Sequence, residues 1–344
     1  MNAKYLAYNI IKTDYAKLHA YVLKLSKDTG KSKIDIYKDV LLCLLKYDTR
    51  FLDYFYFRFF DKSVDKMAHT NVWDMYNFHK KYNGKNADFL RNKLKFRKRF
   101  KEYFSYEYFE FSNKNDIDRL IDWIDKSDSS KLVAKDPYGT VGDGVVILSI
   151  ERRNGILFLD SGQAEVVLLN LYNSGFSLFE RYIEQHEVLK KINPGSINTI
   201  RIVSFVDKRR VVKIWGALLR MGVDKGVDNF DAGGISAKID LETGIIISSA
   251  INKDPFDTRE FDFHPISNSK ITGVKIPFWN EVIALINKAA LELEDVRTVG
   301  WDIALTIDGP TLIEGNDNWD KTHFELVSRL GLNCLVKQAL HENI

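Results

Sequence analysis

The stretch that decides the fold covers residues 300–316 and reads GWDIALTIDGPTLIEGN. Two apolar runs flank an Asp-Gly-Pro turn, so the stretch predicts a β-hairpin. With its loop centred on Asp308, Asp302 lies directly opposite Glu314, and Asn316 shares their face. Opposed carboxylates repel each other, whereas a hard cation such as Mg²⁺ prefers oxygen ligands of this kind. The hairpin therefore predicts a magnesium site at Asp302, Glu314 and Asn316; the alternative is a hairpin that turns ordinary polar residues to water.

A second motif covers residues 131–147 and reads KLVAKDPYGTVGDGVVI. One strand is expected to end at Lys135, and a loop with Gly139, Gly142 and Gly144 leads to the next strand. Glycines let loop amides approach phosphate oxygens, and a lysine at the strand end supplies the matching charge. The spacing fits neither a Walker P-loop nor a GxGxxG dinucleotide motif. The motif predicts a phosphate-binding loop, with a plain hairpin turn as the alternative.

Two arginines, Arg201 and Arg220, stand within otherwise apolar runs that are expected to be strands. A guanidinium inside a buried strand needs an anion to neutralise it. The anion is either a bound ligand or one of the chain's many carboxylates, and the sequence favours neither.

The chain has 344 residues, of which 45% are hydrophobic and 28% charged, which is typical of a globular protein with two or three packed units. Its two cysteines, Cys43 and Cys334, are too few for a disulfide framework, and no CxxC pair predicts a zinc site. No apolar run approaches the roughly 20 residues of a membrane-spanning helix, and no secretory signal is expected. We therefore expect a cytoplasmic protein.

Charge is unevenly distributed along the chain. Residues 1–100 carry 22 Lys and Arg against 10 Asp and no Glu, although the net charge of the whole chain is only +3. Such a region is typical of a lysine-rich helical surface in water, and the alternative is a face that contacts an anionic membrane or glycan. Nucleic acid is not an expected partner.

The hydrophobic periodicity changes along the chain. Before about residue 112, apolar residues recur at three- and four-residue spacing, which predicts helices. Further on, short β-branched runs predict strands at 131–135, 144–149, 178–183, 199–206, 211–221, 235–240, 301–306 and 311–315. Helices are expected at 163–172, 277–293 and 322–341. Strands in neighbouring pairs favour an α+β fold with antiparallel sheets.

Taken in order, these segments resemble the ATP-grasp superfamily, and most closely its sugar-transfer-associated branch, which is found with polysaccharide biosynthesis. The resemblance rests on Lys135-Asp136-Pro137 with the three glycines, on residues 180–186, 193–201 and 229–234, and on the hairpin followed by Asn318-Trp319-Asp320. It implies two α+β lobes, at 91–185 and 186–344, that clamp ATP and Mg²⁺. A mainly helical, basic region at 1–90 precedes them.

The resemblance also implies the contacts to the nucleotide. Lys135 and an earlier lysine, Lys93 or Lys95, would contact the ATP phosphates together with the glycine-rich loop. Glu187 is expected at the ribose. The hinge strand, whose backbone meets the adenine edge, would be formed by Glu180, Arg181, Tyr182 and Ile183.

The groups for the chemistry follow from the same resemblance. Arg201 is expected at the γ-phosphate or at an acyl phosphate, and Lys135, Arg220 and Asn198 are expected as further catalytic residues. The glycines at 233–234 resemble a loop on the substrate side. The magnesium ligands implied by the resemblance are the three hairpin residues.

A site of this kind activates a carboxylate by phosphoryl transfer from ATP, and an amine then attacks the acyl phosphate. The expected function is an ADP-forming carboxylate–amine ligase. Its substrates would be an amine and a sugar acid or amino acid carboxylate, in a capsular, cell-wall or lipopolysaccharide glycan or its precursor. The alternatives are a kinase that phosphorylates a sugar hydroxyl and a nucleotide-binding module of a glycan-assembly complex. A lipid-linked acceptor would add peripheral association with the inner, anionic membrane face.

Overall fold

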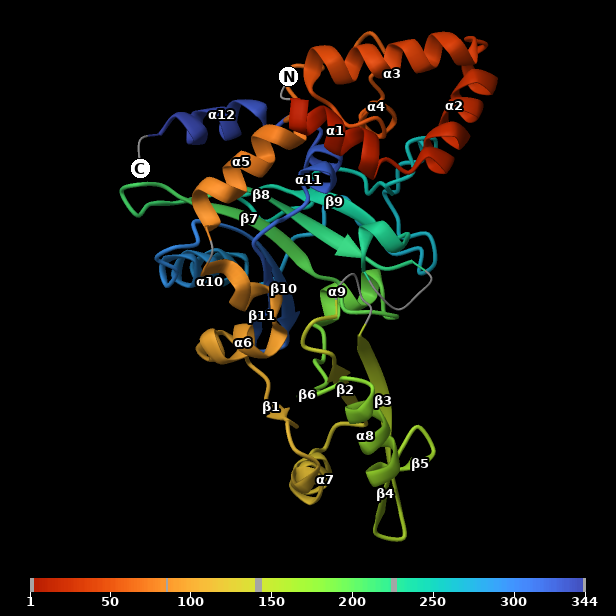
Figure 1. Ribbon diagram of the computed structural model, residues 1–344. Helices are drawn as coiled ribbons and strands as arrows, with labels where there is room; N and C mark the ends of the chain where they lie inside the picture. Colours follow the sequence, from red (N-terminus) through yellow and green to blue (C-terminus); the bar gives the residue numbers. More distant parts are fainter. Residues whose placement is uncertain (1–2, 85, 140–143, 224–227, 343–344) are drawn as a thin grey trace.

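A five-stranded antiparallel sheet lies at the centre of the computed structural model, which describes residues 3–84, 86–139, 144–223 and 228–342 (Figure 1). Its strand order is β11-β10-β7-β8-β9. The strands are β7 (Ile200–Val206), β8 (Val212–Met221), β9 (Ile235–Ile239), β10 (Thr298–Thr306) and β11 (Gly309–Asn316). All the pairings between them are antiparallel, which confirms the expected sheet type.

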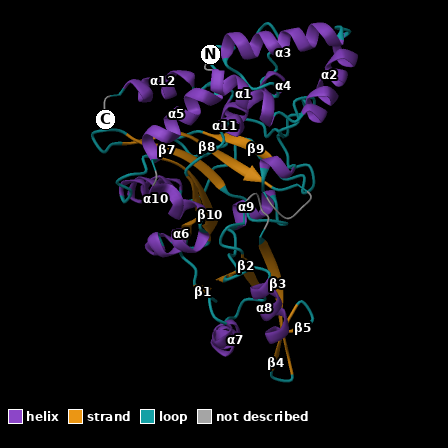
Figure 2. Cartoon of the chain, in the orientation of Figure 1, coloured by secondary structure: helices purple, strands orange, loops and turns teal. Residues whose placement is uncertain are grey.

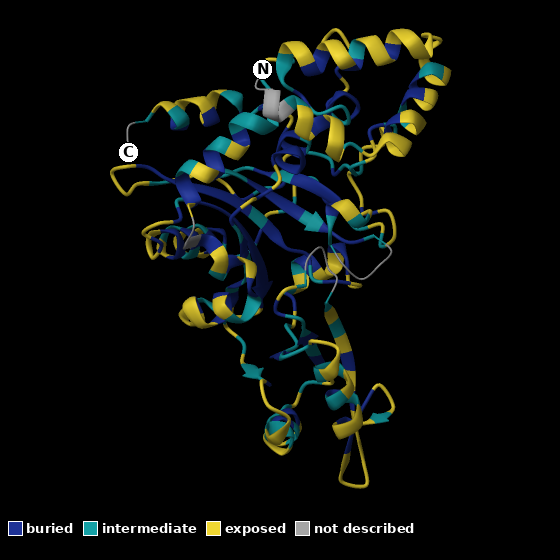
Figure 3. Cartoon of the chain, viewed as in Figure 1, coloured by how far each residue is buried: buried dark blue, intermediate teal, exposed yellow. Residues whose placement is uncertain are grey.

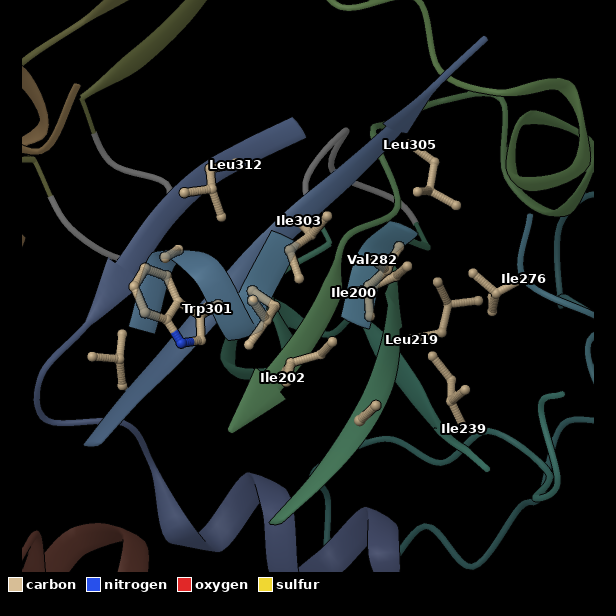
Figure 4. Close-up of a cluster of buried hydrophobic side chains, with 14 of the residues drawn as sticks. Ile200, Ile202, Leu219, Ile239, Ile276, Val282, Trp301, Ile303, Leu305 and Leu312 are labelled. Carbon is tan, nitrogen blue, oxygen red and sulfur yellow. The ribbon is translucent and has the colours of Figure 1, made fainter. Parts of the chain in front are cut away.

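Apolar side chains cover both faces of this sheet, because strand side chains alternate and helices lie on each side. On one face Trp301 and Ile303 pack with Val282 (Figure 4). On the other face Phe205 and Leu218 pack beneath three helices. All nine residues of β10 are therefore buried. The covering helices are α10 (Trp279–Leu291) on the first face and α5 (Val72–Asn83), α11 (Lys321–Ser328) and α12 (Asn333–His341) on the second.

A smaller, six-stranded antiparallel sheet lies at the lower end of the molecule in Figure 1, with the order β1-β6-β2-β3-β4-β5. Leu132, Ala134 and Leu148 pack on one face beneath two helices. The other face carries Lys135 and is less covered, since several residues of β3 are exposed (Figure 3). The elements are β1 (Tyr108–Glu110), β2 (Lys131–Lys135), β3 (Val145–Arg153), β4 (Ile156–Leu159), β5 (Gly162–Gln163), β6 (Leu178–Arg181), α7 (Ile117–Asp125) and α8 (Ala164–Asn173).

Helices form the N-terminal region at the upper end of Figure 1: α1 (Ala3–Lys12), α2 (Tyr15–Thr29), α3 (Lys33–Tyr47) and α4 (Asp53–Tyr56). The side chain of Asp14 caps the start of α2, and that of Ser32 caps the start of α3. Gly30, with a φ of 71°, ends α2 in the left-handed conformation that favours glycine. The expected helical character of this region is confirmed.

Buried aromatic and charged groups join this region to the rest of the chain. Tyr54 and Phe55 lie in a core of their own. Lys321 Nζ of α11 lies 3.5 Å from Asp53 Oδ2 and 3.6 Å from Glu325 Oε2, and all three side chains are buried. Because loss of one partner would leave a buried charge unpaired, these ion pairs hold α4 against α11.

Shorter elements connect the units, as the colouring by secondary structure shows (Figure 2). Beyond β6, Gln185 forms an isolated antiparallel bridge with Thr306 of β10, so the linker between the sheets is fixed to the larger one. The described helices include none long and apolar enough to cross a bilayer. The connecting helices are α6 (Lys93–Arg99), α9 (Glu187–Ile192), η1 (Asn86–Arg91), η2 (Lys101–Tyr103), η3 (Lys114–Asp116) and η4 (Phe230–Ala232).

The single C-terminal helix expected at 322–341 is wrong. The structure has two helices there, because the chain leaves α11 at Arg329, whose φ is 54°. Gly331 then passes so close to Ala68 that a Cβ would lie 1.9 Å from its carbonyl oxygen. Asn333 donates its backbone N–H to the same oxygen at 3.1 Å. A contact with a segment far away in the sequence therefore ends the helix.

Three strands of the smaller sheet lie outside the expected set. β1 falls in the part expected to be helical, and it pairs with β6, with Tyr108 opposite Glu180. β4 and β5 extend the sheet beyond β3. Asn154 and Gly155 between β3 and β4 both have positive φ, as in a two-residue type I′ turn. That Asn-Gly pair is the sequence signal for β4.

Candidate active site

The hairpin of β10 and β11 pairs Asp302 with Glu314, which confirms the predicted register. The loop is not centred on Asp308, however, because Ile307 and Asp308 form a two-residue turn. Ile313 is the extra residue of a β-bulge, and this bulge restores the carboxylate pair. The bulge therefore brings the two carboxylates opposite each other.

Two arginines from the neighbouring strands hold Asp302, which is 3% exposed. Arg201 of β7 donates from Nε and Nη2 to the two carboxylate oxygens, with Nη2 at 2.9 Å from Oδ2. Arg220 of β8 donates from Nη1 to Asp302 Oδ2 at 2.8 Å and from Nη2 to Asp228 Oδ1 at 3.2 Å. The anions beside both arginines are thus the chain's own carboxylates.

The charges of this cluster shift two carboxyl pKa values in opposite directions. Burial disfavours the ionised form of Asp302, yet Arg201 and Arg220 hold its pKa well below the ordinary value. Burial, followed by the Asp302 charge, raises the pKa of Glu314. Asn316 donates from Nδ2 to Glu314 Oε1 at 3.3 Å. The structure therefore brings the three expected metal ligands together.

The donor set fits Mg²⁺. Asp302 and Glu314 lie directly opposite each other, and burial followed by the Asp302 charge raises the pKa of Glu314, so a dication between them would favour both ionised carboxylates. Mg²⁺ is usually held by one or two carboxylates together with phosphates, rather than by an all-protein cage. Within the described ranges there is no group of three or more His, Cys, Asp or Glu side chains that could hold a metal. A cation here would rely on these two carboxylates and the Asn316 amide.

Lys135 ends strand β2 on the less covered face of the smaller sheet. Its Nζ lies 2.5 Å from Glu180 Oε2 on β6, and both side chains are largely buried. Arg97 Nε lies 3.7 Å from the other carboxylate oxygen of Glu180. The Glu180 side chain is therefore fixed between two cations.

Of the two candidate lysines on α6, the structure brings Lys93 toward the site and leaves Lys95 exposed. Lys93 Nζ donates to the backbone oxygens of Asp136, at 3.3 Å, and Gly139. Burial lowers the pKa of Lys93, while the charge of Glu314 acts in the opposite direction. Lys93 thus links the glycine-rich loop to the hairpin of the larger sheet.

The glycine-rich loop is closed by a hydrogen bond from Asp136 N to Gly144 O at 2.8 Å. Gly144 has a φ of 78°, and a Cβ there would lie 2.9 Å from Asp136 Cβ and 3.1 Å from Gly139 Cα. Only glycine fits this position without strain. Gly142 lies outside the described residues.

The strand expected at 178–183 ends earlier, because β6 stops at Arg181 and Tyr182 and Ile183 belong to the following loop. The Arg181 side chain donates to Trp123 O at 2.7 Å and lies over the Trp123 ring, 3.8 Å from its centroid. It therefore packs within the smaller unit. Glu187 begins α9 and is exposed. The adenine and ribose contacts of this segment remain predictions.

Asn198 is fully buried just before β7. Its Nδ2 donates to Gln185 Oε1 at 2.9 Å, to Leu189 O at 2.9 Å and to Asn193 O at 3.1 Å. These bonds hold the start of β7 against α9. The catalytic role expected for Asn198 remains a prediction.

Several charged residues of the site region carry no signal in the sequence. Asp228 accepts hydrogen bonds from Arg220 and from Thr199, although it lies outside the helices and strands. Lys253, also in an irregular segment, pairs with Asp231 and lies 3.4 Å from Asp320 Oδ2. Their partners lie at distant positions in the sequence, so no local pattern identifies them.

His323 is a further buried group that the sequence does not single out. Its ring stacks on Phe230, with 4.3 Å between centroids. Burial and the charges of Arg201 and Arg220 hold its pKa well below the ordinary value, so the ring is neutral at pH 7. His323 therefore adds an uncharged polar group within electrostatic reach of the two arginines.

Three comparisons place this chain among known proteins. It resembles N5-carboxyaminoimidazole synthetase from Staphylococcus aureus complexed with ADP (10% identity, 70% of this chain, 48% of that chain, TM-score 0.42). It also resembles the biotin carboxylase domain of the 2-oxoglutarate carboxylase of Hydrogenobacter thermophilus in complex with MgADP (15% identity, 76% of this chain, 47% of that chain, TM-score 0.45). A third similar structure is L-amino acid ligase from Bacillus licheniformis (14% identity, 74% of this chain, 48% of that chain, TM-score 0.42). The chain spans about half the length of these proteins.

No curated protein matches the sequence. The model of the family described as sugar-transfer associated ATP-grasp matches residues 75–340, which is well over half of the chain. The ordered motifs of the sequence and the paired antiparallel sheets agree with that match. The chain therefore belongs to the sugar-transfer associated ATP-grasp family.

Proposed function

We propose that this protein is an ADP-forming ligase that uses Mg-ATP to activate a carboxylate and then joins it to an amine. One observation carries the proposal: Lys93, which donates to the glycine-rich loop, lies within electrostatic reach of both Lys135 on the smaller sheet and Glu314 on the β10–β11 hairpin, where two arginines hold Asp302. The smaller unit and α6 contribute lysines, and the larger sheet contributes arginines and carboxylates. The charged residues of the proposed site are Lys93, Lys135, Arg201, Arg220, Asp302 and Glu314.

The phosphate side of the proposed site lies around the glycine-rich loop. Lys93 and Lys135 supply positive charge there, and loop amides supply donors without a Cβ in the way. Asp302, Glu314 and Asn316 would hold Mg²⁺, which neutralises phosphate charge when bound. Groups that are fixed before the reaction stabilise developing charge without reorganisation, and the buried ion pairs of this cluster supply that fixation.

The chemistry requires positioning more than covalent catalysis. A carboxylate oxygen of the substrate attacks the γ-phosphorus of ATP, and the bond to the ADP oxygen breaks. The amine then attacks the acyl carbon, inorganic phosphate leaves, and the amine nitrogen loses a proton. We propose that Arg201 and Arg220 neutralise the acyl phosphate; their positions on adjacent strands, where both bind Asp302 beside the proposed Mg²⁺ ligands, support this role.

The acceptor side is proposed to lie beyond the arginines, around the 233–234 loop. Lys253, Asp231 and Asp320 form an ion-pair chain there, which suits a hydrophilic substrate rich in hydroxyl and carboxyl groups. The family is associated with sugar transfer, and this supports a sugar acid, free or within a glycan, as the substrate whose carboxylate is activated and joined to the amine.

The test is an acyl-phosphate trap. The purified protein is incubated with Mg-ATP, a panel of sugar acids and amino acids, and hydroxylamine, which attacks an activated carbonyl in place of the amine. We expect ADP and a hydroxamate for the competent acid. A phosphorylated sugar hydroxyl, with no hydroxamate for any acid, would show that the protein is a kinase. ATP binding without turnover of any kind would show a binding module.

A further inference from the structure

The N-terminal helices expose an unusual share of apolar side chains. Ten of the 25 large apolar residues exposed on the described surface lie between residues 8 and 45. Isolated exposed apolar residues are normal, but a contiguous group marks an interaction surface. This group lies on helices that precede the part of the chain matched by the family.

Helix α3 carries the clearest such surface. Ile34, Tyr37, Leu41 and Leu45 recur at three- and four-residue spacing, so they share one side of the helix, which we term the outer α3 face. Ile34 is 67% exposed and the two leucines 48% each. The inner side buries Ile36, Val40, Cys43 and Leu44 in the N-terminal core. Helix α3 is thus apolar on two sides; the inner side is buried, and on the outer side His19 of α2 contacts Tyr37 while Ile34, Leu41 and Leu45 stay exposed (Figure 3).

The first helix also exposes apolar side chains. Tyr8, Ile10 and Ile11 of α1 are 53%, 47% and 76% exposed. Helices α1, α2 and α3 lie together at the end of the molecule that is opposite β4 and β5 (Figure 1). The apolar residues are therefore concentrated at one end of the protein.

Exposed lysines accompany these apolar residues. Over residues 6–50, eight lysines are exposed but only three aspartates. Lys38 lies on the outer side of α3, one position from Tyr37. The exposed lysines are Lys12, Lys17, Lys24, Lys27, Lys31, Lys33, Lys38 and Lys46. Lys17 and Lys24 lie over aromatic rings and Lys31 pairs with Asp39, so Lys38 is the lysine placed beside the outer α3 face, while the N-terminal helices as a whole are basic. An occupant that offers both apolar contact and negative charge suits this end of the molecule.

We propose that helices α1–α3 dock on an anionic membrane surface, with the outer α3 face at the boundary between headgroups and acyl chains. Lysines beside an apolar helix face are the pattern of helices that lie in this interface. Each basic residue near an anionic leaflet is attracted by the negative charge of the lipids, and an uncharged partner would not give this attraction. A second copy of the chain would bring a like-charged surface and is disfavoured. The inference goes beyond the proposed ligase activity and does not require it.

Docking in this orientation also bears on the proposed acceptor side. Tyr56 of α4 lies near Lys253, whose Nζ is 5.6 Å from the centroid of the Tyr56 ring. Lys253 in turn pairs with Asp231 and Asp320. Helix α4, which packs in the same N-terminal region as the membrane-facing helices, is therefore in contact with the region proposed to bind the acceptor. If the ligase proposal holds, a lipid-linked acceptor is the substrate that this arrangement suits.

The experiment is co-sedimentation of the full chain, without nucleotide, with phosphatidylglycerol-containing vesicles and with pure phosphatidylcholine vesicles. We expect binding to the anionic vesicles at low salt that weakens about tenfold or more at high salt, because charge attraction is screened within roughly 8 Å at physiological salt. Leu41→Ser with Leu45→Ser should weaken binding about tenfold, since it removes apolar contact from exposed positions. Both positions are on the surface, so the variant should fold.

The matched control is Ile156→Ser with Val166→Ser, which removes two exposed apolar side chains from β4 and α8 at the other end of the molecule. It should bind vesicles as the parent does. Absence of binding at low salt, or equal binding by the Leu41/Leu45 variant, overturns the proposal. A parent dimer that this variant dissociates, seen in sedimentation velocity, would instead assign the surface to a second copy. ATP turnover measured in parallel with soluble substrates separates this outcome from failure of the ligase proposal.

Discussion

The five-stranded and six-stranded sheets share an antiparallel plan but differ in how fully they are covered. Helices enclose the larger sheet on both faces, and every residue of β10 is buried. Helices cover one face of the smaller sheet, and exposed residues recur along β3. The two sheets therefore differ in how much of their surface stays uncovered, although the Lys135–Glu180 and Arg201–Asp302 pairs are equally buried.

The difference appears in the partners of those charges. On the larger sheet Asp302 is held by two arginines in three hydrogen bonds, because a buried carboxylate must be paired. On the smaller sheet Lys135 has Glu180 as its counter-ion, and these two side chains are as buried as Arg201 and Asp302. The larger sheet thus fixes its charged groups before any ligand arrives, and the smaller sheet presents its lysine beside the glycine-rich loop. Four predictions test this contrast.

The largest effect is expected for Asp302→Asn. Loss of this charge leaves Arg201 and Arg220 without their shared partner and removes a proposed Mg²⁺ ligand, so turnover should fall on the order of 10³-fold. Glu314→Gln should lower turnover on the order of 10²-fold. Steady-state ADP release with saturating Mg-ATP is the measurement.

The matched control for these variants is Asp308→Asn, because Asp308 is exposed in the turn of the same hairpin. It should change turnover little. Parent-like turnover in the Asp302 and Glu314 variants would mean that the hairpin carboxylates do not serve the reaction.

Acid should destabilise the larger unit before the smaller one. None of the seven histidines lies within residues 108–181, whereas His79 packs beside Trp319 against the larger sheet. Burial lowers the pKa of His79 to about 4, so between pH 6.5 and 4 the unfolded chain binds a proton that the folded chain does not. The contribution of neutral His79 to the free energy of unfolding is fully present above about pH 6.5. About 3 kcal/mol of that free energy is lost as the pH falls to 4.

His79→Asn should remove this part of the pH dependence. Denaturant titrations between pH 7 and 4 should give a flatter stability curve for the variant than for the parent. His341→Asn, at an exposed position of α12, is the control and should keep the parent slope. A parent and a His79 variant with the same slope would contradict the prediction.

Lys135→Met tests the smaller sheet. The variant loses the proposed phosphate contact and leaves Glu180 with only the more distant Arg97, so kcat/KM for ATP should fall about 10²-fold. Lys131→Met on the same strand and face is the control, since Lys131 is exposed. If both variants bind and turn over ATP alike, Lys135 has no special role at the phosphates.

The smallest effect is expected when one glycine in each sheet is replaced by alanine, which tests how tightly each sheet is packed. A Cβ at Gly216 of β8 would lie 2.3 Å from the Phe324 ring, which is itself buried. A Cβ at Gly162 of β5 would lie 2.7 Å from a methyl group of the half-buried Val167. Gly216→Ala should cost about 2 kcal/mol of unfolding free energy and Gly162→Ala about 1 kcal/mol or less. Thermal and denaturant unfolding measure the loss of stability in each variant. Equal losses for Gly216→Ala and Gly162→Ala would contradict a difference in packing between the two sheets.

Much of the larger sheet could be predicted from sequence because its signals are local. Alternation and turn residues place the strands near their observed bounds, whereas the bulge at Ile313 is what brings Asp302 opposite Glu314. The smaller sheet was less predictable, since β1 takes its strand form from pairing with β6. The helix break at Arg329 likewise depends on the approach of Gly331 to Ala68.

The sequence by itself determined the antiparallel hairpin, the glycine-rich loop and the presence of two arginines in apolar strands, because each is encoded by neighbouring residues. Only the tertiary structure decided that Lys93 rather than Lys95 faces the loop, and that both arginines bind Asp302. It also decided that the aromatic run around Tyr54 is buried while α3 keeps an apolar outer face. Burial and ion pairing depend on which distant segments come into contact. The local periodicity of the sequence carries no information about those contacts.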